Sequence, residues 1–337
     1  MTPSLVPPFV PPYNRRDVAA KHYARGLLEG VPHSEYHSDA FHDGPPALSR
    51  SIACRLLNES PLHAWAAHPR LGGCAVADDT AASDLGTLIH GFLLGEAAEI
   101  EIIRIHTNKN KIGPTVPATD YRTKEAQELR DAAREAGKLP VLEHVYEAAL
   151  AIVDPLRNQL DEVTEGAFSE SVKEVTALWE SGGVLCKARM DALHLGRGLV
   201  IDLKFLANAH PVAFGRSMVR YGYDLQHASY LEAVGTCHPE LAGRVDFQFL
   251  LIEVDPHSKV PARLGDRFVI SSPVLAGSKK GLGEARWARA KAKWRACLES
   301  GSWPAYEAAP IEAAPWELQD ELNAGLSSGG DPSWLND

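Results

Sequence analysis

Two apolar runs that each carry one carboxylate constrain the fold of this chain more than any other feature. The first run is Val184–Leu195 and the second is Leu199–Phe205, and Asp191 and Asp202 lie within them. A short Gly-Arg-Gly segment, residues 196–198, joins the runs, which is typical of two adjacent antiparallel strands. A charged group inside an apolar strand is costly unless it is paired or bound to a metal. The pattern therefore predicts a sheet with a polar site in its middle.

Lys204 and His90 add two further polar groups to this predicted site. Lys204 follows Asp202 at a spacing of two residues, so both side chains would point to the same face of the strand. Two carboxylates from neighbouring strands would anchor Mg²⁺, which prefers oxygen ligands. His90 lies on an apolar helix that we expect Ser83 to cap, and an imidazole can complete such a coordination shell. Together these side chains predict a divalent-metal site with a lysine beside it.

Each of these signals has a simpler explanation when it is taken alone. An aspartate and a lysine two residues apart usually form a surface ion pair, and a histidine on an apolar helix is more often a core residue than a ligand. Gln226 and Tyr230 are one helical turn apart, which ordinary packing also explains. However, the apolar residues on both sides of Asp202 and Lys204 predict a central strand. The metal-site interpretation therefore depends on the combination of residues.

The composition limits the class of protein. The 337 residues carry a formal net charge of −10, which argues against indiscriminate coating of nucleic acid but allows a local basic surface. The five cysteines are scattered without a CxxC pair, so we expect reduced thiols in the cytoplasm and neither a zinc ribbon nor an iron–sulfur cluster. No apolar run is long enough to cross a membrane, and the N-terminus lacks the order of a secretion signal. We therefore expect a cytoplasmic protein with no membrane partner.

Helical patterns precede strand patterns along the chain, which predicts an α/β core with helical additions and not a regular βαβ ladder. We expect an extended arm and a short helix in residues 1–30, one domain over 31–310 and a partly disordered tail over 311–337. Within the domain we expect a helical part over 45–160, a sheet core over 165–256 and a basic helix over 278–300. The other expected helices cover 15–28, 123–136, 141–160 and 211–233, and Ser49 and Ser60 are expected N-caps. We expect strands over 167–178 and 244–254 and a loop over 101–120.

Two other segments have a functional and a simpler interpretation. His33, His37 and His42 have a zinc-like spacing, but they lie in a segment without cysteine partners, which favours solvated loop histidines. Residues 277–283, GSKKGLG, lack the arrangement of a phosphate-binding loop, so we expect a turn before a helix.

The basic helix is either a solvated face or a surface that follows DNA phosphates. Its basic residues are Lys279, Lys280, Arg286, Arg289, Lys291, Lys293 and Arg295. We expect Trp287 and Trp294, which share one face of this helix, to pack in the core. A second and weaker basic cluster consists of Lys109, Lys111, Arg122 and Lys124.

The central residues resemble the PD-(D/E)XK nuclease superfamily. Asp191 followed by Asp202, Leu203 and Lys204 is similar to the catalytic core of that superfamily. The position before the first aspartate, which often holds proline there, is Met190 in this chain. That position is commonly variable, so the departure carries little weight.

Other motifs resemble narrower branches of the superfamily. Gln226 and Tyr230 in QHASY are similar to the Q-x-x-x-Y motif of the RecB-like branch, and His90 in LGTLIH is similar to the histidine on its helix before the sheet. The segments EYHSDAFHDGPPALSRSIACRLLNESP, CKARMD and CLESGSWPAY resemble the RecE-like (exodeoxyribonuclease VIII) group. The resemblance spans residues 36–306, and the order of the motifs is more specific than any one of them.

The resemblance implies a PD-(D/E)XK (restriction-endonuclease-like) core, in which helices flank a central mixed sheet. It implies that His90, Asp191 and Asp202 bind the metal, with the Leu203 carbonyl as a further ligand and Lys204 as the catalytic lysine. The cofactor would be Mg²⁺, with two ions in each site and Mn²⁺ able to substitute.

The same resemblance places further residues beside the metal. Gln226, Tyr230 and Arg189 would contact the DNA strand. An additional acid on the first strand, Glu170 or Glu174, would approach the metal, and Glu170 lies where the group usually has one.

The function that the resemblance implies is exonucleolytic digestion of DNA from duplex ends. It implies 5′→3′ polarity, ATP independence, a homo-oligomer, a single-strand annealing protein as partner, a role in recombination, and a bacterial cell with a phage or prophage origin. One alternative is an endonuclease or a Cas4-like nuclease, and the absence of a cysteine quartet argues against its cluster-bearing form. The other alternative is a catalytically dead DNA-binding or assembly protein, against which the intact Asp191, Asp202 and Lys204 argue.

Overall fold

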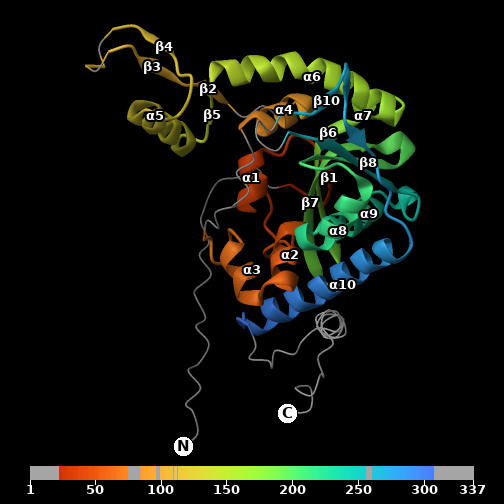
Figure 1. The fold of residues 1–337 in the computed structure, drawn as a ribbon. Coiled ribbons are helices and arrows are strands. Elements are labelled where there is room, and N and C mark those ends of the chain that lie inside the picture. The colour runs from red at the N-terminus through yellow and green to blue at the C-terminus, as the bar shows by residue number, and fades with distance from the viewer. Residues whose placement is uncertain are drawn as a thin grey trace, which may run out of the picture. The chain divides into compact units, whose positions relative to one another are not determined.

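A mixed six-stranded sheet in the order β1-β6-β7-β8-β9-β12 forms the centre of the fold (Figure 1). The computed structural model describes residues 23–74, 84–95, 99–108, 110–111, 113–255 and 260–306. β6 to β8 form the predicted antiparallel meander, and β9 pairs with β8 in parallel. The sheet strands are β1 (Gly26–Leu28), β6 (Val172–Ser181), β7 (Val184–His194), β8 (Leu199–Leu206), β9 (Asp246–Glu253) and β12 (Ile270–Ser271). The predicted α/β class with a central mixed sheet is confirmed.

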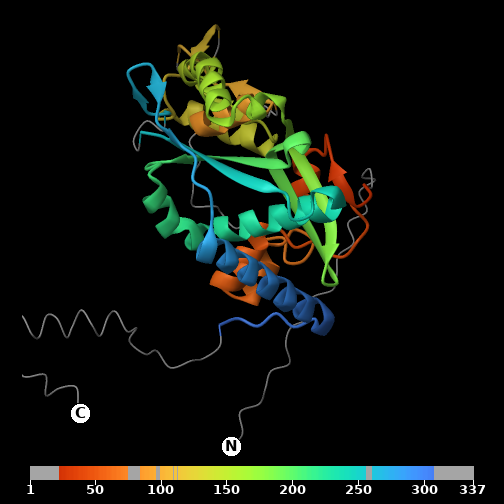
Figure 2. The ribbon, with the colours of Figure 1, turned by 90° about the vertical axis from the view of Figure 1, so that its right-hand side faces the viewer.

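Helices cover both faces of the sheet, as Figure 2 shows. One face packs against α2, α9 and α10 around the buried Trp287 and Trp294, which confirms the core role expected for these tryptophans. The other face packs against α4 and α6. Successive residues of β9 alternate between the two clusters, so its apolar run reflects burial on both faces. The helices are α1 (His33–Ser38), α2 (Arg50–Asn58), α3 (Pro61–Ala67), α4 (Asp84–Leu94), α5 (Lys124–Glu135), α6 (Glu143–Thr164), α7 (Ala167–Glu170), α8 (Pro211–Tyr221), α9 (Tyr223–Cys237) and α10 (Gly277–Ser300).

Side-chain caps explain where several helices begin. Ser49 accepts a hydrogen bond from the backbone N–H of Ile52, and Ser60 accepts one from that of His63. Both residues were predicted N-caps, and Pro61 occupies the first turn of α3. The predicted cap Ser83 lies outside the described residues.

Several predictions of local structure were wrong. Residues 26–28 form strand β1, where a helix was expected; the remainder of that predicted helix, up to residue 22, lies outside the described residues. Residues 167–170 form helix α7 before β6 begins. The helix expected over 211–233 is divided into α8 and α9 at Gly222. The φ of Gly222 is 69°, a backbone conformation that residues with a Cβ rarely adopt. Residues 277–283 are the first turns of α10 itself and not a turn before it.

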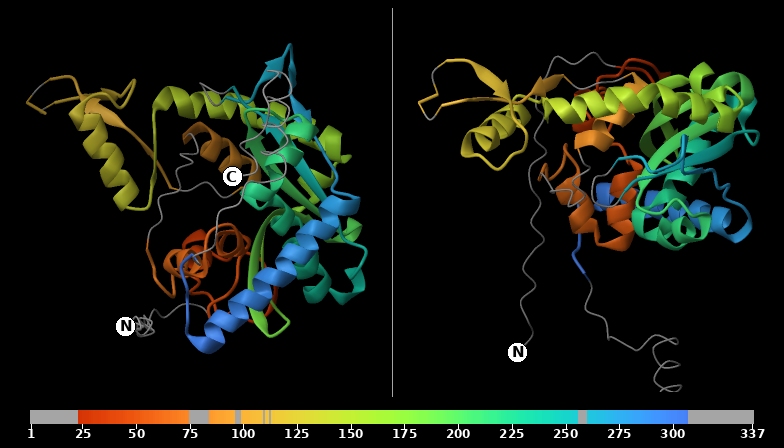
Figure 3. Two further views of the ribbon diagram at one scale, coloured as in Figure 1. Left: turned by 60° about the horizontal axis from the view of Figure 1, so that its bottom comes forward. Right: turned by 45° about the horizontal axis from the view of Figure 1, so that its top comes forward.

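The expected loop over 101–120 contains short strands instead. Figure 3 shows these strands and α5 beyond one end of α6. β2 pairs with β5 in parallel, and β3 pairs with β4 antiparallel. The remaining elements are β2 (Ile100–Ile102), β3 (Arg104–His106), β4 (Thr115–Pro117), β5 (Leu139–Val141), β10 (Arg263–Leu264), β11 (Arg267–Phe268), η1 (Leu195–Arg197) and η2 (Pro239–Leu241).

The described residues up to Trp303 make one compact unit. Residues 304–337 belong to a second unit, of which only 304–306 are described, so the expected disordered tail over 311–337 lies outside the described residues, as does most of the expected arm. No helix within the described ranges is both long and apolar enough to span a bilayer.

A buried polar cluster around Asp39 connects the segment that contains α1 to β7. The Lys187 ammonium lies 2.8 Å from an Asp39 oxygen, and His42 and the backbone N–H of Ala47 also contact this carboxylate. Asp39 and Lys187 are both buried. His42 is buried as well, so the expectation of a solvated loop histidine was wrong for it, while His33 and His37 are exposed on α1.

Replacement of Asp39 by Asn should destabilise the protein strongly. Loss of one partner from a buried ion pair leaves an uncompensated charge, and we expect the free energy of unfolding to fall by about 3–5 kcal/mol. The measurement is urea unfolding followed by circular dichroism. The control is Glu162→Gln, which removes an exposed ion pair with Arg267 and should change this free energy by less than about 1 kcal/mol. Equal effects in the two variants would contradict the structural role of the cluster.

His68 should make stability depend on pH. Burial lowers the pKa of His68 to about 4, against the opposing effect of Asp39. Between about pH 6.5 and pH 4 the unfolded chain therefore binds a proton that the folded chain does not, so the free energy of unfolding falls as the pH falls. The contribution is about 3 kcal/mol across this window. His68→Gln should flatten the dependence in unfolding experiments at several pH values, and an unchanged slope would show that other groups dominate it.

Candidate metal and catalytic site

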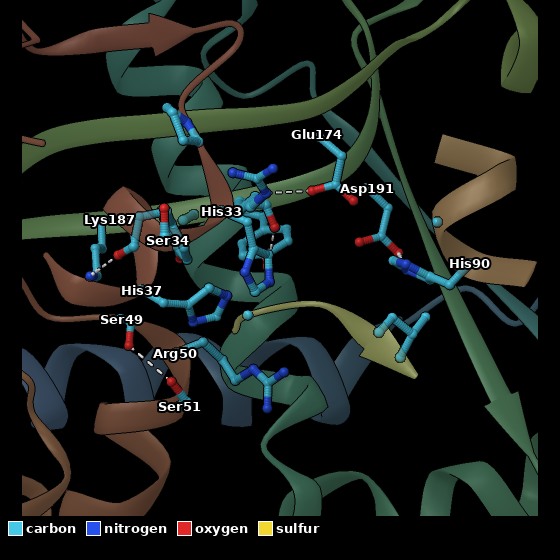
Figure 4. A pocket seen from close by; sticks show the side chains of 18 of the residues that line it. His33, Ser34, His37, Ser49, Arg50, Ser51, His90, Glu174, Lys187 and Asp191 are labelled. Atoms are coloured by element: carbon cyan, nitrogen blue, oxygen red, sulfur yellow. Dashed lines mark hydrogen bonds and ion pairs between the residues drawn. The ribbon is translucent and has the colours of Figure 1, made fainter. Parts of the chain in front are cut away.

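His90, Glu174 and Asp191 converge at one wall of a pocket of about 900 Å³ (Figure 4). They come from α4, β6 and β7, and one ligand atom from each lies within 4.8 Å of the others. His90 Nε2 is 3.4 Å from Asp191 Oδ2. Two carboxylates and one imidazole form a donor set that suits a divalent cation such as Mg²⁺ or Mn²⁺.

The sheet opens at the point where Asp191 enters the site. The described ladder between β7 and β8 covers residues 192–194 opposite 199–201. Beyond it, the backbone N–H of Leu203 donates to Asp191 Oδ2 at 2.8 Å. A carboxylate thus occupies a hydrogen-bonding position that a backbone carbonyl would hold in a regular ladder. This bond orients Asp191 relative to β8, which carries Asp202 and Lys204.

Glu174 reaches the site through an unusual backbone conformation. Its φ is 55°, in the left-handed region that residues with a Cβ rarely adopt. The flanking pairs, Lys173 with Ala192 and Val175 with Met190, place Glu174 opposite Asp191. Such a conformation costs on the order of 1–3 kcal/mol and persists where the surrounding structure enforces it. Here it accompanies two carboxylates on facing strand positions.

Asp202, which is buried, and Lys204, which is half-buried, form a pair beside this group. The Lys204 ammonium makes an ion pair with Asp202 and lies 3.5 Å from the carbonyl oxygen of Leu203. Burial raises the pKa of Asp202 to about 6, against the opposing effect of Lys204. The pair therefore brings a carboxylate and an amine to the strand next to Asp191.

The protonation preferences of the first group follow from its contacts. Burial would raise the pKa of Asp191, but His90 and Lys204 outweigh it and hold this pKa below its ordinary value. Burial would lower the pKa of His90, but Asp191 outweighs it and raises this pKa. Burial raises the pKa of Glu174, which Arg189 opposes. His90 and Asp191 therefore stabilise each other's charged forms, whereas burial and the neighbouring Asp191 disfavour the charged form of Glu174.

Gln226, Tyr230 and Arg189, the predicted DNA contacts, have partners inside the protein. The Gln226 amide donates to Asp202, and the Tyr230 hydroxyl donates to the backbone carbonyl of Arg189 at 2.7 Å. The Arg189 guanidinium donates to Glu174 and to the carbonyl of Val31. All three predicted residues are buried. In these positions they orient site carboxylates and strands, and their contact with DNA stays a prediction.

Of the two acids left open by the sequence, Glu174 is the one that lies with His90 and Asp191 in the candidate metal-binding group. The Glu170 carboxylate contacts His194 at 3.1 Å and Arg197 at 3.3 Å, and its side chain is 61% exposed. The signal that favours Glu174 is its position opposite Asp191 in the strand register, which a sequence without strand pairing does not reveal.

The pocket has a second wall that was not predicted from the sequence. Arg50, Ser49 and Ser51 at the start of α2, together with His33 and His37 on α1, line it (Figure 4). All of these residues except His33 lie in the motif that resembles the RecE-like group, but residue type alone does not show that they share a cavity with the carboxylates.

Only some of the basic residues of helix α10 are exposed to solvent. Arg286 is buried against Asp224, and Lys291 pairs with Glu232. Lys279, Lys280, Arg289, Lys293 and Arg295 are exposed. In the weaker basic cluster, Lys111 and Lys124 pair with Glu128 and Arg122 with Asp120, while Lys109 lies outside the described residues.

The mixed sheet, its flanking helices and the acid-bearing central strands define a PD-(D/E)XK-like fold. The chain belongs to the family described as "PDDEXK-like domain of unknown function (DUF3799)", whose model matches residues 53–262. No curated protein matches the chain.

Two solved structures are similar to this chain. A crystal structure named "Putative exonuclease", from Eubacterium rectale, is 16% identical with a TM-score of 0.50, and the match covers 88% of this chain and 99% of that one. A phage related exonuclease from Haemophilus somnus is 15% identical with a TM-score of 0.26, and the match covers 64% of this chain and 95% of that one. The first similarity supports the fold.

Glu174→Gln should weaken divalent-cation binding, whereas Glu170→Gln should not. Removal of one carboxylate charge from the donor set should raise the dissociation constant for Mn²⁺ by about tenfold or more. Isothermal titration with Mn²⁺ measures the effect, and Glu170→Gln is the matched acid on the neighbouring helix α7. Equal affinities in the two variants would remove Glu174 from the site.

Proposed function

We propose that this protein is a metal-dependent exonuclease that hydrolyses phosphodiester bonds from the ends of duplex DNA. The observation that carries the proposal is the convergence of His90, Glu174 and Asp191 beside the ion pair of Asp202 and Lys204. Membership of a PDDEXK-like family supports the nuclease class. The name "Putative exonuclease" of the first similar structure agrees with an exonuclease activity.

The residues present fit a divalent cation. Glu174, Asp191 and His90 would hold one ion, and Asp202 on the adjacent strand, with the Leu203 carbonyl, would contribute to the same centre or to a second ion. The bound cation would activate water and neutralise charge on the scissile phosphate. The oxygen-rich set favours Mg²⁺, with Mn²⁺ able to substitute.

Lys204 would stabilise negative charge that develops on the phosphate. Its ammonium is positioned by Asp202, by the Leu203 carbonyl and by the ring of Tyr223 at 5.3 Å. Because these contacts exist before substrate binds, little reorganisation is needed when charge develops. Gln226, which donates to Asp202, would hold the orientation of this carboxylate.

The finer assignment follows the RecE-like resemblance. It comprises 5′→3′ polarity, independence of ATP, a homo-oligomer, an annealing protein as partner, and a recombination role in a bacterial cell or phage. Digestion of linear duplexes labelled at either 5′ end tests the polarity. Intact closed circles in the same reaction would distinguish this activity from an endonuclease, and binding without hydrolysis would indicate a dead nuclease core.

Lys204→Met and Asp202→Asn should each reduce hydrolysis of linear duplex DNA by about 10²–10³-fold, since each removes charge stabilisation at the reacting centre. DNA binding, measured by fluorescence anisotropy without divalent cation, should change much less. The matched control is Lys138→Met, because Lys138 pairs with Glu99 and Glu101 outside this site. Wild-type rates in Lys204→Met and Asp202→Asn would refute the roles assigned to them.

A further inference from the structure

We propose that Tyr221 is a base-stacking platform that holds an unpaired base of the bound DNA strand close to the scissile phosphate. This inference rests on the proposed function, because it assigns a contact for the DNA of that same site. Tyr221 ends helix α8 and is 45% exposed. In the described ranges up to Trp303, it is the one exposed residue among the phenylalanines, tyrosines and tryptophans.

A row of rings and cations connects Tyr221 to the catalytic strand. The Lys204 ammonium lies 5.3 Å from the centre of the Tyr223 ring, and the Tyr223 and Tyr221 ring centres are 5.7 Å apart. The Arg220 guanidinium lies 5.9 Å from the centre of the Tyr221 ring. The row begins at the group proposed to contact the scissile phosphate and ends at an exposed ring beside an arginine. Such spacing places a stacked base within a few nucleotides of the cut.

Tyr221 also adjoins the pocket. Its backbone carbonyl accepts a hydrogen bond from Arg50 at 3.2 Å, and Arg50 lines the pocket that contains His90, Glu174 and Asp191. A strand that leaves this pocket past Arg50 would therefore meet the Tyr221 ring. Cationic side chains along a backbone path and an aromatic ring for a base are the combination by which proteins bind single-stranded nucleic acid.

The turn between the two tyrosines is held in place before any ligand binds. Gly222 has a φ of 69°, and a Cβ at this position would lie 2.9 Å from Cys54 Sγ on α2. On the other side, the Tyr223 ring stacks on Phe214, with ring centres 5.2 Å apart and planes within 17°. The Tyr-Gly-Tyr segment thus holds the exposed ring on two packed helices, which lowers the entropy cost of binding a base.

The test combines a protein variant with a substrate variant. The probe is a fluorescent DNA duplex with a short single-stranded tail, and single abasic sites are placed in turn at each nucleotide near the end. Dissociation constants are measured by anisotropy with EDTA present, so that hydrolysis does not enter. In the wild-type protein we expect one abasic position to raise the dissociation constant by about 5- to 100-fold.

Tyr221→Ala should raise the dissociation constant for the intact probe by a similar factor, and the abasic site at that position should then cost nothing further. Tyr221→Phe should keep wild-type affinity, since it keeps the ring. Val212→Ala, which truncates a 55% exposed side chain on the same helix, should also bind as the wild type does. Wild-type affinity in Tyr221→Ala, or an abasic penalty that persists in it at every position, would overturn the inference.

The outcomes separate this inference from the proposed function. If the wild-type protein hydrolyses linear duplex DNA and Tyr221→Ala binds the intact probe with wild-type affinity, the exonuclease assignment stands and only the stacking role of Tyr221 is rejected. If the wild-type protein neither binds nor hydrolyses the DNA, both the exonuclease function and the stacking role of Tyr221 are rejected.

Discussion

The hydrogen bond from the Leu203 backbone to Asp191 is the interaction on which the site depends. In a regular antiparallel ladder, the amide of one strand bonds to a carbonyl of the next. Here a side-chain carboxylate takes the amide at 2.8 Å. The described pairing of β7 with β8 covers residues 192–194 and 199–201 and ends there, so the two strands separate from Asp191 onward. The result is a polar position within a sheet that is apolar on both faces.

The surrounding groups lower the free-energy cost of placing charged side chains at this position. Buried carboxylates would neutralise or move to solvent without partners. Asp191 has His90 and a backbone amide, Asp202 has Lys204 and Gln226, and Glu174 has Arg189. His90 and Gln226 come from α4 and α9, which pack on the sheet, and the other partners lie on strands of the sheet itself. The contacts that pair these charges therefore also orient the carboxylates at the candidate metal site.

Sequence reasoning predicted the parts of the site that lie on regular elements. Asp202 and Lys204 share a strand with period two, so residue spacing was sufficient to group these two. His90, on an apolar helix, was grouped with them only through the combination of motifs. Glu174 escaped a definite assignment because its position depends on the pairing of β6 with β7 and on a left-handed backbone. Glu170, the expected acid, is instead on a short helix whose existence the β-rich pattern of the segment concealed.

The wrong predictions of local structure have the same physical origin, because they also concern segments whose conformation involves tertiary contacts. Strand β1 gains its stability from pairing with β6, a partner distant in sequence, and the short strands over 100–117 likewise depend on their partners. The break between α8 and α9 was missed because a single glycine is tolerated within a helical pattern. Gly222 adopts a left-handed conformation there and lies so close to Cys54 on α2 that a Cβ would meet its sulfur, a contact that the local sequence does not show.

The two walls of the pocket are joined through β7. Its residues Lys187, Arg189 and Asp191 recur at a spacing of two, so one strand reaches successively toward Asp39, Glu174 and His90. The first contact fixes the α1 segment, which carries His33 and His37, and the last two fix the acidic group. Because all three contacts involve one strand, movement of the α1 wall relative to the acidic wall must break a buried ion pair or distort β7. The pocket is therefore preorganised along its length, which is what a site that must orient a charged, flexible polymer requires.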